Sequence, residues 1–230
     1  MYLYETHMHT SEVSACAIST ASEQVLAYKN RGYAGIVVTD HFFTGNIRHS
    51  GARSWEGKLR FFARGYEEAK KAGQRIGLDV FFGWEYSIGG MDFLTYGLGL
   101  DFLQGNPKIA RIASVEEYSR LVRASGGYLA QAHPFREAFW FTSQTAVSPE
   151  LIDGVEVQNG ITPAEYNKKA LSFAKTHSLP MQSGSDSHEA GTPSGLFGVE
   201  IENKPKSISD IVAAIKSGRA KLVPHYSEEC

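Results

Sequence analysis

Cysteine is scarce in this sequence, which contains only Cys16 and Cys230 among its 230 residues. Secreted domains that depend on disulfides carry a denser set of cysteines, so we expect a reduced protein. The chain also lacks an apolar run of about 18 residues, the length that a membrane-spanning helix needs. Its beginning shows no basic segment followed by an apolar one, as a signal peptide would. These absences predict a cytoplasmic protein with no membrane partner.

A dense run of lysine and arginine is missing as well, and the formal net charge is −2. Proteins that bind nucleic acids usually present a basic face or stripe, so the composition does not favour a nucleic acid as partner. The residues are 42% hydrophobic and 21% charged, which is ordinary for a globular protein with a sizeable core. Because no linker or internal repeat divides the chain, we expect a single domain over residues 1–230.

Short apolar runs rich in Val, Ile, Phe and Tyr alternate with amphipathic stretches and predict eight strands. They cover residues 2–7, 34–41, 78–85, 92–99, 127–133, 154–160, 179–188 and 196–202. Strands that alternate with helices favour an α/β fold with a parallel sheet. Eight strands in a chain of this length suit a small (β/α) barrel or a doubly wound sheet. Residues 42–56 have no clear periodicity and follow a strand, where substrate loops usually lie.

Helix starts are indicated by a hydroxyl residue followed three positions later by an acid, the capping-box pattern. Four such pairs occur: Thr20 with Glu23, Ser114 with Glu117, Thr162 with Glu165, and Ser207 with Asp210. Pro163 is expected at the first position of its helix, a place that favours proline. A further helix is predicted over residues 57–73.

Nearly all of the predicted strands end in residue types that bind metal ions. These residues are His7 and His9, Asp40 and His41, Glu85, His133, Glu156 and Asn159, and Asp186 and His188. Side chains two apart on a strand share a face, so His7 and His9 converge. In a parallel barrel the carboxyl ends of the strands form one face, where active sites are built. Imidazole and carboxylate together suit zinc, iron or manganese, and Glu85 and Asp186 are able to bridge two ions.

The order of these motifs resembles that of the PHP (polymerase and histidinol phosphatase) family. The matching segments are "HMHT" at 7–10, "TDH" at 39–41, "GWE" at 83–85, "AHPFR" at 132–136 and "GSDSH" at 184–188. The resemblance runs from the first strand to at least Gly198. It implies a distorted (β/α)7 barrel, two or three divalent ions, and hydrolysis of phosphate esters by a hydroxide that bridges two of the ions.

Position by position, the resemblance assigns ligands to three ions. The first takes His7, His9, Glu85 and Asp186, the second Glu85 and His133, and the third His41 and His188. Asp40 is expected to orient a neighbouring ligand during catalysis.

The sequence departs from the family pattern at two positions. Ala15 stands where many members have a His or Asp, and Glu12 is a candidate replacement as ligand. Gly99 stands where some members have a His, so a dinuclear site is an alternative to a trinuclear one.

Arg136 is the main candidate for recognising phosphate, because a guanidinium binds phosphate through two hydrogen bonds. It enters both the catalytic and the substrate-binding set, and Asn159 joins the latter. Arg48, Arg53 and His49 are weaker candidates. Cys16 is interpreted as a packing residue without a base partner, His177 as the end of a helix, and His225 as part of a terminal tail.

The leading hypothesis is a metal-dependent phosphoesterase acting on a small phosphorylated metabolite or a nucleotide. Three alternatives remain: a 3′–5′ exonuclease, a metal-binding module without catalysis, and an amidohydrolase-like enzyme that cleaves C–N bonds. The sequence leaves open the substrate, the choice between monoester and diester, the metal and the oligomeric state.

Overall fold

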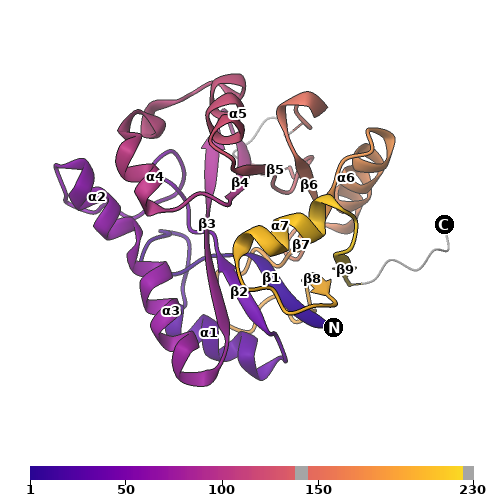
Figure 1. Cartoon of the computed structure of the whole chain (residues 1–230), viewed down its shortest axis with the longest axis horizontal. Coiled ribbons are helices and arrows are strands. Elements are labelled where there is room, and N and C mark those ends of the chain that lie inside the picture. Colours follow the sequence, from indigo (N-terminus) through magenta and orange to yellow (C-terminus); the bar gives the residue numbers. More distant parts are fainter. Residues whose placement is uncertain (138–144, 225–230) are drawn as a thin grey trace.

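The computed structural model describes residues 1–137 and 145–224, and their elements alternate between strands and helices as expected (Figure 1). The strands are β1 (Tyr2–Met8), β2 (Gly35–Val38), β3 (Asp79–Ile88), β4 (Met91–Tyr96), β5 (Tyr128–Gln131), β6 (Gly154–Asn159), β7 (Met181–Gly184), β8 (Gly198–Ile201) and β9 (Lys221–Val223). The α-helices are α1 (Ala21–Asn30), α2 (Trp55–Phe62), α3 (Arg64–Ile76), α4 (Leu100–Gly105), α5 (Val115–Ala124), α6 (Ala164–Thr176) and α7 (Ile208–Lys216). Two short 3₁₀ helices are η1 (Pro107–Arg111) and η2 (Pro149–Leu151).

The strands form one mixed sheet in the order β7-β6-β5-β4-β3-β2-β1-β8-β9. Strand β4 is antiparallel to both of its neighbours, and β8 is antiparallel to β1 and β9. The expected parallel sheet is therefore interrupted, and a (β/α)7 count is not confirmed. The reason lies at Gly89 and Gly90, whose φ angles of 58° and 86° turn β3 directly into β4 without an intervening helix.

The sheet curves until its first strand meets the segment after β7, which makes it a nearly closed barrel. Met8 and Ser187 form a parallel bridge there, the Asp186 amide donates to the His7 carbonyl at 2.8 Å, and the His9 amide donates to the Ser187 carbonyl at 2.9 Å. Residues far apart in the sequence are thus joined through their backbones at the carboxyl ends of β1 and β7.

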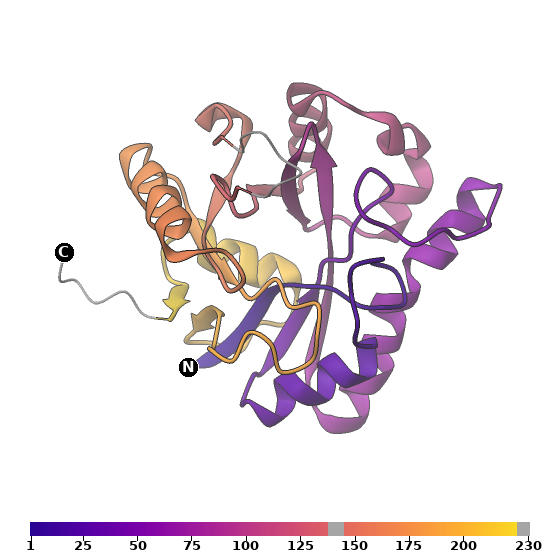
Figure 2. The same cartoon turned by 180° about the vertical axis from the view of Figure 1, so that it is seen from behind.

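Apolar side chains fill the outside of the barrel and one of its ends. Helices α1 and α3 pack together against β1, β2 and β3, with Val25, Ile36 and Ala69 in one buried cluster. Helix α7 packs on β4 and β7, and its Ile211 joins a cluster with Tyr4. That cluster lies at the amino ends of the parallel strands, so α7 covers the end opposite to the strand-end residues. Figure 2 shows the molecule from this other side, with α7 (yellow) at the back.

Helix starts follow the predicted caps in part. Both hydrogen bonds of the capping box are present at Thr20–Glu23 and at Ser207–Asp210, whereas Ser114 accepts only from the Glu117 amide. The prediction for Thr162 is wrong, because its hydroxyl donates to Asn159 and Pro163 precedes the helix instead of opening it.

The helix predicted over residues 57–73 is two helices, α2 and α3, and the Ser54 hydroxyl caps the first. Strand β9 was not predicted from the sequence. No helix in residues 1–137 and 145–224 has the length and apolar character that crossing a membrane requires.

Candidate metal centre

Seven predicted ligands lie together where the carboxyl ends of the parallel strands meet: His7, His9, His41, Glu85, His133, Asp186 and His188. Five of them are essentially buried, while His41 and His188 are partly exposed. His133 and Asp186 have φ angles of 29° and 55°, in a region that side chains other than glycine rarely adopt. Such strained conformations concentrate at functional sites, where the surrounding structure holds them.

The donor atoms form overlapping groups in which all members lie within 4.8 Å of one another. The central group is His7, His9 and Glu85; the carboxylate group is Glu85, Asp92 and His133; the histidine group is His9, His41 and His188; a fourth comprises His7, His133 and Asp186. Glu85 is the only carboxylate that belongs to two of these groups.

The central group presents two imidazole nitrogens to one point. His7 Nδ1 is 2.9 Å from Glu156, and His9 Nδ1 is 3.1 Å from the Ser14 hydroxyl, which donates to Asp40. In the neutral rings both Nδ1 atoms therefore carry the hydrogen, which leaves both Nε2 atoms as acceptors. These Nε2 atoms are only 3.2 Å apart. Two lone pairs at this distance repel each other, so the neutral rings fit a cation bound by both; in the metal-free centre the raised pKa of His7 lets its Nε2 donate to His9 Nε2 instead.

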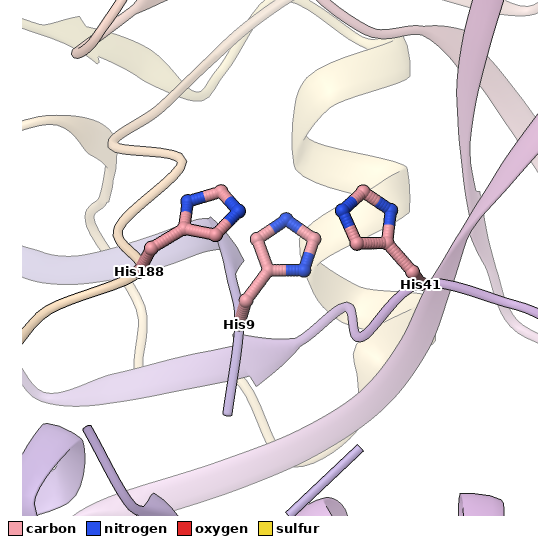
Figure 3. A group of neighbouring side chains, drawn as sticks. All are labelled: His9, His41 and His188. Carbon is pink, nitrogen blue, oxygen red and sulfur yellow. The ribbon is translucent and has the colours of Figure 1, made fainter. Parts of the chain in front are cut away.

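The histidine group brings together the loops after β1, β2 and β7. Figure 3 shows the His9 ring between the rings of His188 and His41. The ring centroids are 4.3 Å apart on one side and 4.4 Å on the other. His188 Nδ1 lies 2.8 Å from the Asp186 carbonyl, its acceptor, so its Nε2 is also left as an acceptor.

Several buried polar atoms of the centre contact each other without hydrogen bonding. His41 Nδ1 lies 2.8 Å from Glu85 Oε2, yet the angles do not suit a hydrogen bond and neither atom has another partner. His133 Nδ1 is likewise buried without a partner. Because buried polar groups are nearly always satisfied, atoms left in this way call for an explanation. Divalent ions bound among these donors would provide one, so the residues fit the metals that the sequence implies.

Negatively charged groups dominate the electrostatics around His7. Burial opposes the positive charge on His7, but Asp186, Glu156 and Glu85 outweigh it and raise the His7 pKa well above its usual value.

Burial lowers the pKa of His9, and the neighbouring His188 and His41 lower it further. Burial alone would raise the pKa of Glu85, but the surrounding histidines hold it well below its usual value. The chain therefore keeps the carboxylate ionised and His9 neutral, the states in which both bind metals.

Asp40, expected to orient a ligand, does so through Ser14. Its buried carboxylate accepts from the Thr10 amide, the Thr10 hydroxyl and the Ser14 hydroxyl, all at 2.7 Å. Gly65, near the start of α3, packs so closely behind it that a side chain there would overlap Asp40 and Thr10. This support behind His9 is typical of metal sites, where outer partners fix the rings of the ligands.

Glu156 and Asn159 form a second support behind the ligands. Glu156 accepts from His7 Nδ1 and from the His133 amide, and the Asn159 side-chain amide donates to both Glu156 and Asp186. Asn159 is 1% exposed, and its Oδ1 accepts from the Thr162 hydroxyl. This geometry gives Asn159 a role in positioning Asp186, in place of the substrate contact expected from the sequence.

Asp92 is a member of the centre that the sequence analysis missed. It lies on β4 opposite Ser87, whose hydroxyl donates to it, and its Oδ2 is 4.0 Å from His133 Nε2. The sequence pattern places ligands only at the carboxyl ends of strands. Because β4 is antiparallel, its beginning lies at this face, and the Gly89–Gly90 pair was the signal of that reversal.

Two predictions about the loop after β1 are corrected. Both carboxylate oxygens of Glu12 accept from the Ala21 amide, at 2.9 and 3.1 Å, so Glu12 caps α1 and is not among the grouped ligands. Cys16 is not a simple packing residue, because its thiol contacts the imidazoles of His188 and His41. Burial raises the Cys16 pKa, but these two contacts outweigh burial and lower it to about 6.

A cavity of about 610 Å³ opens above the centre. Its walls include four of the predicted ligands and Asp92, and Thr44, Gly45 and Asn46 come from the loop predicted to face the substrate. Arg136 is the one lysine or arginine among the described residues that line it, and its Nη1 donates to Asp186 Oδ2 at 2.9 Å.

The three weaker candidates lie away from this cavity. Arg48 is exposed and donates to the Ala17 carbonyl, and His49 and Arg53 are exposed as well. His177 ends α6 and contacts Phe173, as predicted. His225 lies outside the described residues.

The chain resembles known proteins in both sequence and fold. Residues 164–220 match the family model described as PHP-associated. A candidate metal-dependent phosphoesterase from Bifidobacterium adolescentis has a similar structure, with a TM-score of 0.57 and 18% identity over 92% of this chain and 94% of that one. A two-domain protein from Bacteroides vulgatus, containing a predicted PHP-like metal-dependent phosphoesterase, gives a TM-score of 0.70 and 16% identity over 96% of this chain. These matches support the resemblance to the PHP family that the motifs indicate.

A further solved structure shares this fold. An amidohydrolase from Chromobacterium violaceum, solved with bound sulfate and no metal, gives a TM-score of 0.55 and 17% identity over 92% of this chain and 96% of that one. This chain spans 64% of the Bacteroides chain. No curated protein sequence matches it significantly. At these identities the structural likeness describes the fold alone.

Proposed function

We propose that this protein is a PHP-type metal-dependent phosphoesterase that hydrolyses a phosphate ester of a small metabolite or a nucleotide, with two or three divalent ions. The observation that carries the proposal is Glu85, a buried carboxylate shared by two groups of ligands on the floor of the cavity. A shared carboxylate suits ions close enough together to hold the same phosphate.

Each part of the reaction has a candidate residue. Bound divalent ions would stabilise charge on the phosphate oxygens and acidify a water molecule. In the hydrolysis, a water oxygen adds to phosphorus, the bond from phosphorus to the alcohol oxygen breaks, and the alcohol takes up a proton. Arg136 is 22% exposed at the cavity, and its guanidinium would bind a phosphate oxygen while its contact with Asp186 fixes its direction.

The lining of the cavity favours a small substrate over a polynucleotide. Glu85, Asp92, Glu137 and Asp186 contribute negative charge, against the single guanidinium of Arg136 in the described lining. A long polyanion would need a row of positive charges beyond the reaction centre. The bound ions and Arg136 suffice for one phosphate group.

The test is an assay of chelator-treated protein reloaded with Mn²⁺ or Zn²⁺. The substrates are p-nitrophenyl phosphate, bis-p-nitrophenyl phosphate, a p-nitroanilide amide and single-stranded DNA. We expect turnover of the monoester and a loss of roughly 100-fold or more in His9→Ala, because outer partners of ligands alone cost 10- to 100-fold. His177→Ala is the matched control, since His177 is an exposed histidine at the end of α6.

Each alternative has its own outcome in this assay. Turnover of DNA or the diester without the monoester would replace the proposal with an exonuclease-type activity. Turnover of the amide alone would favour C–N hydrolysis. Bound metal without turnover of any substrate would identify a binding module without catalysis.

A further inference from the structure

The side chain of Gln24 lies at the junction where the end of β1 meets the segment after β7. Gln24 belongs to α1 and is fully buried. Its Nε2 donates to the His9 carbonyl at 3.2 Å and to the Ser187 carbonyl at 3.3 Å. Because both acceptors are carbonyl oxygens, the NH₂ end of the amide must face them, which fixes its orientation. One side chain thus holds the backbones of two segments that are far apart in the sequence.

These contacts extend the backbone hydrogen bonds that cross the junction. The Asp186 amide donates to the His7 carbonyl at 2.8 Å, and the His9 amide donates to the Ser187 carbonyl at 2.9 Å. The Ser187 carbonyl therefore accepts from His9 and from Gln24 together. The Gln24 amide lies where this short ladder ends.

Beyond this point the two backbones take different partners. The Thr10 amide donates to Asp40, and the His188 carbonyl accepts from the Ile18 amide. The bonds from Gln24 are therefore the contacts that hold the two segments together at the place where they separate.

Both of the carbonyls that Gln24 contacts adjoin ligands of the centre. One belongs to His9 itself, and the Ser187 carbonyl belongs to the peptide unit that leads into His188. His9 and His188 supply two of the three rings of the histidine group. The Ser187 hydroxyl, 3.2 Å from Gln24 Nε2, donates to the Glu189 carbonyl at 2.9 Å and so continues the support past His188.

We propose that Gln24 is a positioning residue of the metal centre, which sets the separation between the segment that carries His9 and the segment that carries Asp186 and His188. Outer partners that orient metal ligands typically contribute 10- to 100-fold in metal affinity. Asp40 supports the ring of His9, whereas Gln24 acts on the backbones of two ligand segments at once. This inference rests on the proposed function only in requiring that a metal ion binds.

The test is Gln24→Met, because methionine is close to glutamine in length and cannot donate a hydrogen bond. Zinc affinity of chelator-treated protein is measured by competition with a zinc indicator, and urea unfolding is measured on the same metal-free samples. We expect zinc affinity to fall by about tenfold or more. Stability should fall as well, because two buried carbonyls lose a donor.

Ser119→Ala is the matched control. The Ser119 hydroxyl is buried on α5 and donates to the Leu151 carbonyl at 2.6 Å, and α5 carries none of the ligands. Its removal also deletes a buried bond from a side chain to a backbone carbonyl. We expect lower stability in Ser119→Ala with zinc affinity unchanged, so the comparison separates positioning from stability.

Two further measurements keep the test decisive. In metal-free protein, hydrogen exchange at the His9 amide should be faster in Gln24→Met than in the parent and unchanged in Ser119→Ala. Circular dichroism shows whether each variant is folded. If Gln24→Met does not fold, Ser187→Ala takes its place, because it removes only the hydroxyl beside Gln24 Nε2 and should weaken zinc binding to a smaller extent.

The possible outcomes separate this inference from the proposed function. Zinc affinity within twofold of the parent in folded Gln24→Met, or unchanged in Ser187→Ala where that variant replaces it, would overturn the inference and leave the phosphoesterase proposal in place. An equal loss of affinity in Ser119→Ala would do the same. Weaker zinc binding in Gln24→Met, with no turnover of any ester by the parent, would support the inference and refute the proposed function. A parent protein that binds no zinc would refute both.

Discussion

Glu156 is the residue through which the support of the metal centre can be tested most sharply. Its Oε1 accepts from His7 Nδ1 at 2.9 Å, and its Oε2 accepts from the His133 amide at 3.0 Å and from Asn159 at 2.9 Å. Three donors therefore face one fully buried carboxylate. Glu156→Gln keeps the shape but replaces one acceptor oxygen with an NH₂ group.

Either orientation of the new amide leaves a donor facing a donor. If its oxygen faces His133 and Asn159, its NH₂ group faces His7 Nδ1 and forces the hydrogen of His7 onto Nε2, the atom that would bind metal. If the amide is reversed, two donors lose their acceptor. We expect metal affinity to fall by about 10- to 100-fold, or about 1.4–2.8 kcal/mol. Stability should fall by about 1–3 kcal/mol for the unsatisfied donor.

The assay is a competition titration of chelator-treated protein against a zinc indicator, with unfolding in urea measured on the same samples. Glu165→Gln is the control, because Glu165 is exposed in the first turn of α6. A folded Glu156→Gln protein that binds zinc within twofold of the parent would refute the role of Glu156 in orienting His7.

Three further predictions concern other parts of the centre. Burial raises the pKa of Glu5 from 4.5 to about 7, so between these values the folded chain keeps a proton that the unfolded chain releases, and stability falls as pH rises. At about 1.4 kcal/mol per pH unit, the free energy of unfolding should fall by about 3 kcal/mol. Urea unfolding of metal-free protein at about pH 4.5 and about pH 8 should show this fall in the parent protein and largely lack it in Glu5→Gln. An equal fall in both proteins would contradict the prediction. Gly65→Ala should lower the free energy of unfolding by about 1–3 kcal/mol and weaken zinc binding, because the added methyl group overlaps Thr10 and Asp40. Unchanged stability and zinc affinity would mean that α3 moves to accommodate the methyl group. Arg136→Lys should raise KM for the monoester by about tenfold with a smaller change in kcat, since lysine lacks the planar fork, and steady-state kinetics showing an unchanged KM would remove Arg136 from substrate binding.

The ligands were predictable from the sequence where strand direction was regular. His7, His133 and Asp186 follow short apolar strands, and parallel strands bring their carboxyl ends to one face. Their convergence therefore needed only the correct assignment of strands.

Residues outside that regular pattern could not be placed in the same way. Asp92 depends on the reversal of β4, and Cys16 depends on the path of a loop held by backbone hydrogen bonds to two other loops. Periodicity determines which face a strand residue occupies, but it carries no information about the path of a loop. Glu12 was assigned to the ligands for the same reason, although it caps α1.

The position of the metal centre at the junction between β1 and β7 implies that a bound metal stabilises the barrel. His7 and His9 come from one side of this seam and Asp186 from the other, and few backbone hydrogen bonds join the two edges. A cation bound by all three residues would hold the two edges of the barrel together. Removing the metal with a chelator should then speed hydrogen exchange at the His9 and Asp186 amides before it speeds exchange in the rest of the sheet.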